Sequence, residues 1–190
     1  MEEVNRSSIK QVAKAELNGN IGSYIIVVIV QALVSMLPLF GQICQPVFTY
    51  GFIKCIKSIR EGGSFDLDEY ISGFGPNFAN IMITGWTKIA YVFLGSLLCV
   101  LPGLYFQLIY FWTDYIMVED PTRSTSEVLE LSKALAKDRI VDILIYNFSW
   151  IGWLFLVSFT CGLGMLYVVP YIQLATLGMY EAYKAFTIIE

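Results

Sequence analysis

The sequence predicts an all-α polytopic membrane protein: a six-helix transmembrane bundle built from three hairpins, plus short interfacial amphipathic helices. Three observations predict it. Hydrophobic residues make up 56% of the 190 residues and charged residues 15%, whereas soluble domains carry about 25% charged residues. Several weakly charged runs approach the roughly 20 apolar residues that a span requires. The lysines and arginines gather at one end of these runs.

Six runs are predicted to span the membrane, all within one domain, 1–190. Four of them hold at most one charged residue each. Two others are weaker, because one ends with Lys54 and Lys57 and the other is short and holds Asp114; such runs can cross a locally thinned bilayer. The predicted spans are 21–40, 42–59, 78–101, 104–118, 141–161 and 164–183.

The distribution of basic residues supports six spans rather than four. Lysine and arginine are retained on the cytoplasmic side of a membrane. Six spans place the basic segments inside, together with both termini, and three uncharged turns outside. The basic residues concerned are Arg6, Lys10, Lys14, Lys54, Lys57, Arg60, Arg123, Lys133, Lys137, Arg139 and Lys184, and the turns are 37–46, 101–103 and 161–164.

Proline and glycine mark these turns. Pro46 closes the first turn, Pro102 and Gly103 form the second, and Gly164 closes the third. Pro170 lies inside the sixth span, where we expect it to kink the helix.

Three segments are predicted to lie on the inner membrane surface as amphipathic helices: 8–17, 65–74 and 124–137. The last opens with Ser124 followed by Glu127, the spacing of a capping box. The favoured interpretation is that they anchor the bundle at the headgroups, with docking of a cytoplasmic partner as the alternative.

Lys88 is the most informative single residue, because a charge in the middle of a span is costly and usually faces the bundle interior. It lies about 14 residues before the Pro102-Gly103 turn, and Asp114 lies about 11 residues after it, so their depths differ by only about 4 Å. We expect an intramembrane ion pair. It either fixes the helix register or acts as a gate or proton-linked switch, and the structural role is favoured.

Small and polar residues predict how the helices pack. Gly85 and Gly95 share a face with Lys88, and small residues allow close helix approach. Polar stripes on other spans predict either a polar centre or, preferably, separate interhelical hydrogen bonds. The stripe residues are Gln31, Gln107, Tyr110, Gln173, Thr176 and Tyr180.

The tryptophans and cysteines are given mainly structural interpretations. Trp86, Trp112, Trp150 and Trp153 fall within spans rather than at their ends, which favours core packing over the alternative of an apolar ligand pocket. Three cysteines map to the outer ends of helices, where a disulfide is conceivable, but small unpaired thiols are favoured. These are Cys44, Cys99 and Cys161.

The residue inventory argues against an enzyme. Histidine is absent, which removes the commonest general base near neutral pH and the commonest metal ligand. No nucleophile-elbow, Walker or zinc-protease motif is present. We therefore expect no catalytic residues, no cofactor and no metal. The net charge of -4 gives no basis for nucleic-acid binding.

The chain resembles a bacterial integral membrane protein family, Domain of Unknown Function 975, over nearly its whole length. The resemblance implies a multi-span protein in the bacterial cell membrane and implies no activity. At Ala136-Lys137-Asp138 the sequence departs from the glycine-containing turn of the family, so a continuous helix is expected there. The matching pieces are Asn5-Arg6, Lys10, Ala13-Lys14, 17–20, Ser64-Phe65, Asp68, Gly73-Phe74, 101–103, 148–153, 163–171 and Tyr180-Glu181.

Three functions stay open. The leading prediction is a non-enzymatic transport or export component, or an accessory of a transporter, motivated by the ion pair, the polar stripes and the broken helices. The alternatives are an immunity protein that binds a membrane-active peptide or toxin, and a structural or assembly factor. The expected partners are the lipid bilayer and a membrane or cytoplasmic protein or a second copy of the chain.

Overall fold

The computed structural model describes residues 6–160 and 162–189, which are helical with short turns between the helices. The predicted all-α class is confirmed, and the described residues contain no strand. The elements are α1 (Arg6–Gly19), α2 (Ile21–Ser35), α3 (Phe40–Ile43), α4 (Gln45–Arg60), α5 (Leu67–Ile71), η1 (Ser72–Phe74), α6 (Phe78–Leu98), α7 (Val100–Ile109), α8 (Thr113–Glu119), α9 (Thr125–Ala136), α10 (Ile140–Phe148), α11 (Ile151–Phe159) and α12 (Met165–Ile189).

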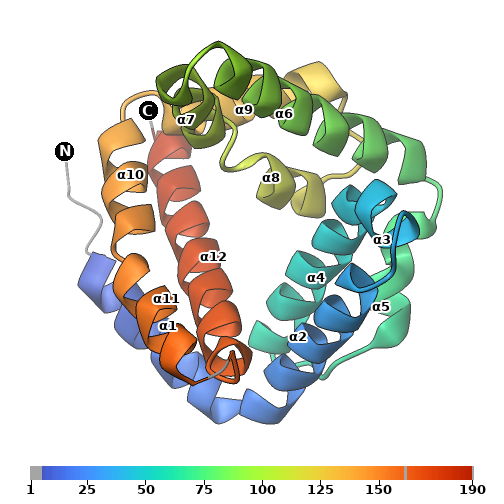
Figure 1. Ribbon diagram of the computed structural model, residues 1–190, viewed down its shortest axis with the longest axis vertical. Coiled ribbons are helices and arrows are strands. Elements are labelled where there is room, and N and C mark those ends of the chain that lie inside the picture. Colours follow the sequence, from blue (N-terminus) through green and yellow to red (C-terminus); the bar gives the residue numbers. More distant parts are fainter. Residues whose placement is uncertain (1–5, 161, 190) are drawn as a thin grey trace.

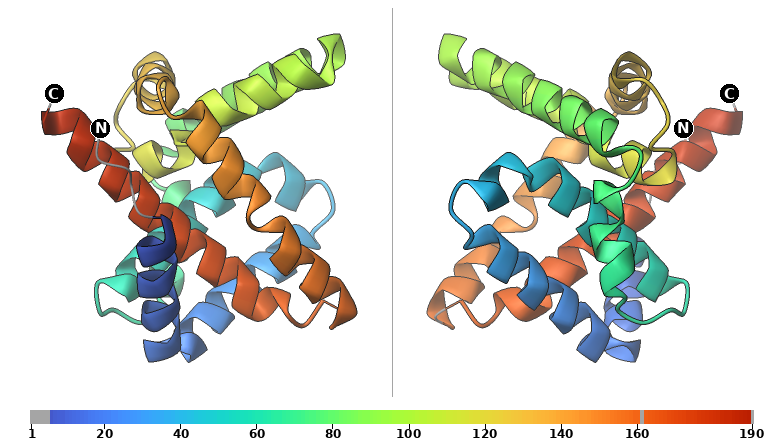
Figure 2. Two further views of the ribbon diagram at one scale, coloured as in Figure 1. Left: turned by 90° about the vertical axis from the view of Figure 1, so that its left-hand side faces the viewer. Right: turned by 90° about the vertical axis from the view of Figure 1, so that its right-hand side faces the viewer.

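The helices form three hairpins arranged around a common centre (Figure 1). The first joins α2 to α4 through α3, the second joins α6 to α7 and α8, and the third joins α10 and α11 to α12. In both views of Figure 2 the three hairpin turns point to the same side of the molecule. We call this the apolar side. Helix α1, the α4–α5 loop, α9 and the C-terminal end of α12 lie toward the opposite, charged side.

The apolar side exposes large hydrophobic side chains at every turn. Met36 in the first turn is 78% exposed, Leu98 at the second is 83% exposed, and Leu163 at the third is 73% exposed. No charged residue lies in the sequence near any of these turns. Large exposed apolar patches mark contact with lipid or with another protein, and the exposed side chains at the three turns lie on one side of the molecule.

The helices are shorter than the predicted spans. Judged by length and hydropathy, α6 is the one described helix that is long and apolar enough to cross a bilayer unbroken. Helices α1 and α2 together are long and apolar enough for one span only if the 93° bend between them is counted within that span. The expected span 104–118 is divided between α7 and α8, and the expected span 141–161 between α10 and α11. Six unbroken spanning helices are therefore not confirmed.

Where these helices break, side-chain hydroxyls donate hydrogen bonds to backbone carbonyls at the helix ends. After α7, the Thr113 hydroxyl donates to the Tyr110 carbonyl (2.9 Å), and the Ser132 hydroxyl of α9 donates to the Ile109 carbonyl (3.0 Å). After α10, the Ser149 hydroxyl donates to the Tyr146 carbonyl (2.6 Å). Because a helix end leaves carbonyls without helical donors, these hydroxyls stabilise the breaks.

One turn prediction needs correction. The α6–α7 turn lies at Cys99, whose backbone is extended, so Pro102 and Gly103 fall inside the first turns of α7 rather than in the loop. Proline is tolerated there, because the first-turn N–H groups have no helical acceptor. Pro170 lies within α12, as expected, and α12 continues past it to Ile189; the kink at Pro170 stays a prediction. Gly164 does lie in the turn before α12, where its N–H donates to the Thr160 hydroxyl (3.0 Å).

The three expected amphipathic segments are helical. Segment 8–17 lies in α1, which packs against α12; segment 65–74 forms α5 and η1; and segment 124–137 corresponds to α9. Ser124 and Glu127 form the predicted capping box. The continuous helix expected at residues 136–138 is wrong, because α9 ends at Ala136 and α10 starts at Ile140.

Candidate functional site

The structure brings Lys88 and Asp114 together across α6 and α8, with Lys88 Nζ 2.6 Å from Asp114 Oδ2. Their side chains are 21% and 28% exposed. The cavity beside Asp114, between α4, α6 and α8, measures about 10 Å³. That is at most the room of one water molecule, so the helices beside Asp114 form a packed seam, while the side chains of the pair keep partial access to the molecular surface.

Glycines allow the helices around this seam to approach closely. A Cβ atom on Gly85 would lie 2.4 Å from Pro46 Cβ, so the predicted packing glycine of α6 meets the predicted turn proline of α4. On the same helix, a Cβ on Gly95 would lie 2.5 Å from the Phe106 ring of α7. Gly103 of α7 approaches Ser96 so closely that a Cβ there would overlap the Ser96 side chain.

The predicted polar stripe does not form one polar centre. Its members bond to different neighbours: the Tyr70 hydroxyl donates to Gln31 (2.6 Å), the Tyr115 hydroxyl donates to Gln173 (2.5 Å), and the Tyr146 and Thr176 hydroxyls share a hydrogen bond (2.8 Å). Tyr180 donates to Glu119 (2.8 Å), Tyr110 packs against Tyr91, and Gln107 is exposed beside an apolar groove.

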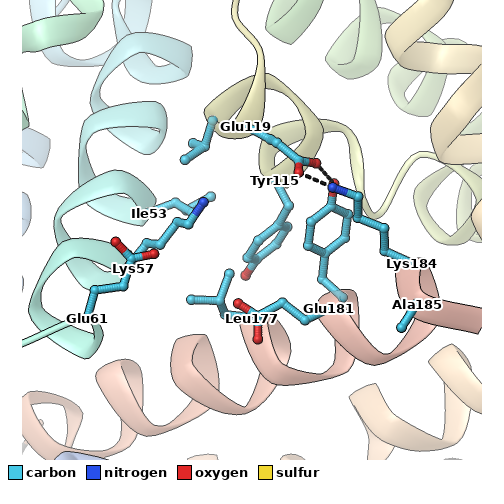
Figure 3. A pocket seen from close by; sticks show the side chains of 11 residues that line it. Ile53, Lys57, Glu61, Tyr115, Glu119, Leu177, Glu181, Lys184 and Ala185 are labelled. Atoms are coloured by element: carbon cyan, nitrogen blue, oxygen red, sulfur yellow. Dashed lines mark hydrogen bonds and ion pairs between the residues drawn. The ribbon is translucent and has the colours of Figure 1, made fainter. Parts of the chain in front are cut away.

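A second cavity lies at the charged side, between α4, α8 and α12, and measures about 400 Å³. Figure 3 shows Lys57 on one wall, facing Tyr115 and Glu119 on α8, with Leu177, Glu181 and Lys184 of α12 along another wall. Its size falls within the range of about 300–1,000 Å³ usual for small-molecule sites. The stripe residue Tyr180 also lines it.

Glu119 is held at this cavity by two side chains of α12. Lys184 forms an ion pair with it and the Tyr180 hydroxyl donates to it. Partial burial alone would raise the pKa of Glu119, but the hydrogen bonds from Lys184 and Tyr180, together with the charges of Lys184 and Lys57, outweigh burial and lower its pKa. The carboxylate is therefore held in its charged form.

Arg60 ties three helices together beside the same cavity. Its guanidinium contacts Glu16 of α1 (3.1 Å) and Glu181 of α12 (2.8 Å) from the end of α4. Burial would lower the pKa of Arg60, but the two carboxylates outweigh burial and raise it. The charged ends of α1, α4 and α12 are thereby held in one network.

The tryptophans differ in how far they are buried, and the described outer cysteines are unpaired. Trp112 and Trp150 are buried, whereas Trp86 is partly exposed and donates to the Ile43 carbonyl (3.0 Å). Trp112 packs against the rings of Tyr115, Tyr180 and Tyr183 at the α8–α12 contact. Of the three outer cysteines, Cys44 and Cys99 are free thiols, and Cys161 lies outside the described residues.

Sequence reasoning missed the network at the charged side. Arg60 was used only as a topology signal, Glu16 stood in the segment 8–17 expected at the membrane surface, and Glu119 was given no role. Arg60 and Glu181 are 121 positions apart in the sequence. Gly51 was missed as well: a Cβ there would lie 1.8 Å from the Tyr70 carbonyl oxygen, so only glycine lets α4 meet α5 this closely. A glycine inside an apolar run was the one available signal.

Comparison with known proteins places the chain in a family. A family model matches residues 70–186, a shorter range than the resemblance noted above, and it leaves out the pieces before residue 70. No match is found among curated proteins or among solved structures. Since the matched range covers more than half of the sequence, the chain belongs to the family described as protein of unknown function (DUF975).

Proposed function

We propose that this chain is a non-enzymatic integral protein of the bacterial cell membrane that serves transport or export, as a component or as an accessory of a transporter. The observation that carries the membrane assignment is the separation of the two sides. The three uncharged turns expose apolar side chains on one side, and the basic segments lie toward the other. With lysine and arginine retained inside, the turns face outward and both termini face the cytoplasm.

The broken helices are compatible with this assignment. Non-helical backbone is tolerated at membrane depth where protein groups satisfy it, and the hydroxyls of Thr113, Ser132 and Ser149 do so at the two breaks. Discontinuous helices are also common in transporters, where they surround the binding site. Here the α7–α8 break lies two residues before Asp114.

The transport role rests on the charged-side cavity and not on the ion pair. The cavity is open at the ends of α4, α8 and α12, where the proposed topology places the cytoplasm. The packed seam around Lys88 and Asp114 favours a register-fixing role for that pair. The same seam favours the second candidate, a structural or assembly factor, if the cavity transports nothing.

Thiol labelling tests the topology. In a variant whose remaining cysteine is Cys99, a membrane-impermeant maleimide applied to intact cells is expected to label the thiol, because Cys99 is exposed at an outer turn. A matched variant with no native cysteine and Lys137→Cys, on the charged side, is expected to react only after the membrane is permeabilised. The reverse pattern, or a chain that alkaline carbonate strips from the membrane, contradicts the assignment.

Proteoliposomes test transport. Ethidium and carboxyfluorescein serve as cationic and anionic probes, and flux of at least one above that of protein-free liposomes is expected. Ala185→Trp should reduce this flux because Ala185 is exposed and lines the cavity, whereas Ala79→Trp, at an exposed position near the start of α6, should not. Absence of flux, or equal flux in both variants, favours the structural role.

A further inference from the structure

The charged-side cavity combines an apolar wall with a small set of ionic groups. Ile53, Val118 and Leu177 supply apolar surface, and five charged side chains also line it: Lys57, Glu61, Glu119, Glu181 and Lys184. Ile53 lies one helical turn before Lys57 on α4, on the bilayer side of it in the proposed topology. An occupant that matches both surfaces is amphipathic.

Most of these charges are already paired within the protein. Glu119 is bound by Lys184, and Glu181 is bound by Arg60. Lys57 and Glu61 differ: among the residues that the structure describes, neither side chain makes a hydrogen bond or a direct ion pair, although the charge of Lys57 acts on Glu119 from across the cavity. The cavity therefore presents one cation and one anion that are available to a ligand.

Lys57 and Glu61 are four positions apart on one helix face and still do not pair. A lysine that precedes a glutamate by four residues is the weaker of the two orders for a helical ion pair, so little holds the two side chains to each other. Side chains at this spacing have Cβ atoms about 5–6 Å apart. A ligand with an anionic and a cationic group a few bonds apart can satisfy both at once.

We propose that the cavity binds a zwitterionic amphiphile of the phosphoethanolamine class, with the phosphate on Lys57, the primary ammonium on Glu61 and the apolar chains along Ile53, Val118 and Leu177. This inference rests on the proposed membrane location, and it names the ligand class of the proposed transport cavity. A primary ammonium donates N–H bonds to a carboxylate, and charge-assisted bonds of this kind are the strong ones. The trimethylammonium of phosphocholine has no N–H group and binds Glu61 less well.

Native mass spectrometry of the full chain in detergent tests the inference. The probes are phosphatidylethanolamine, phosphatidylcholine and phosphatidylglycerol with identical acyl chains. Phosphatidylethanolamine is expected to be retained at the lowest concentration. Lys57→Gln and Glu61→Gln should each weaken its binding by about tenfold, as expected for loss of one charge-assisted hydrogen bond. Glu61→Gln should also remove the preference over phosphatidylcholine.

Matched controls separate the site from general charge effects. Lys133→Gln and Glu130→Gln remove one positive and one negative charge at exposed positions of α9. Both variants should leave lipid binding unchanged. Equal binding of the three lipids, preference for phosphatidylglycerol, or unchanged binding in both cavity variants overturns the inference. Soluble glycerophosphoethanolamine is expected to bind far more weakly than the lipid; equal binding overturns the amphiphile assignment in favour of a soluble ligand.

Flotation with liposomes distinguishes failure of this inference from failure of the proposed function. If the chain inserts into phosphatidylcholine liposomes but shows no preference for ethanolamine headgroups, the membrane assignment stands and the ligand assignment is contradicted. If the chain does not float with liposomes of any composition, both the membrane assignment and the ligand assignment are contradicted.

Discussion

Lys88 Nζ lies 2.6 Å from Asp114 Oδ2, although the α6–α7 turn and the break before α8 separate the two residues along the chain. The contact joins α6, the long helix of the second hairpin, to α8, which packs against α4 and is hydrogen-bonded to α12 through Tyr115 and Gln173. It is therefore an ionic link between the protruding α6–α7 arm (Figure 2) and the rest of the molecule.

Lys88→Met is expected to destabilise the protein by about 1–3 kcal/mol, because Asp114 then loses its ionic partner. The estimate lies between the roughly 0–1 kcal/mol of surface pairs and the about 3–5 kcal/mol lost when a buried pair is broken, since both side chains are partly exposed. The measurement is equilibrium unfolding in detergent, followed by circular dichroism. The double variant Lys88→Met/Asp114→Leu should be more stable than Lys88→Met, and additive losses would contradict coupling of the two residues.

Glu119 predicts a loss of stability in acid. Its pKa is lowered in the folded protein from an ordinary value of 4.5, so the folded state binds this proton more weakly than the unfolded state does. The carboxylate then stabilises the fold above pH 4.5, and this contribution is lost as the pH falls through the lower, folded pKa. Glu119→Gln should remove that part of the pH dependence.

Unfolding at several pH values between neutral and strongly acidic checks the Glu119 prediction. The stability gap between the wild-type chain and Glu119→Gln should be constant near neutrality and should narrow below pH 4.5. Glu130→Gln on exposed α9 serves as the control. A gap that widens on acidification would show that the ion pair with Lys184 and the bond from Tyr180 do not favour the charged form.

The sequence was sufficient to predict the hairpins and the Lys88–Asp114 contact. Apolar length and the placement of basic residues are properties of the linear chain, and they predicted three turns on one side, as Figure 2 shows, with the second turn displaced by a few residues to Cys99. Lys88 and Asp114 lie at similar numbers of residues from a hairpin turn, so they are brought to the same depth regardless of which side chains surround them. The capping box at Ser124 is likewise a local pattern of four residues.

The helix breaks and the charged-side network could not be predicted in the same way. The break between α7 and α8, Tyr110-Phe111-Trp112, contains no glycine or proline, and the Ser132 hydroxyl of α9 contributes to stabilising it at the Ile109 carbonyl. Arg60 and Glu181 lie on different helices, so no helical periodicity in the sequence indicates that they are in contact. Both features depend on tertiary packing, which overrides local signals.

Gly85→Ala is expected to cost about 1–3 kcal/mol, the usual penalty for overpacking, because the new methyl would lie 2.4 Å from Pro46 Cβ. Gly22→Ala is the matched control: it also replaces a helical glycine, but nothing lies within 4 Å of its added Cβ. That change should be neutral or stabilise the helix by up to about 1 kcal/mol. Thermal unfolding of the two variants checks the pair, and equal melting temperatures would contradict close packing of α6 on α4.

Ser132→Ala tests whether α9 holds the break between α7 and α8. Ser132 is fully buried, and its hydroxyl donates to the Ile109 carbonyl at the end of α7. Leaving a buried acceptor without this donor should cost about 1–3 kcal/mol, whereas Ser64→Ala in the exposed α4–α5 loop should change stability little. Amide hydrogen exchange gives the local readout. Faster exchange confined to α7, α8 and α9 is expected, and unchanged exchange in Ser132→Ala would mean that the break is maintained by the packing of Trp112 against α12 instead.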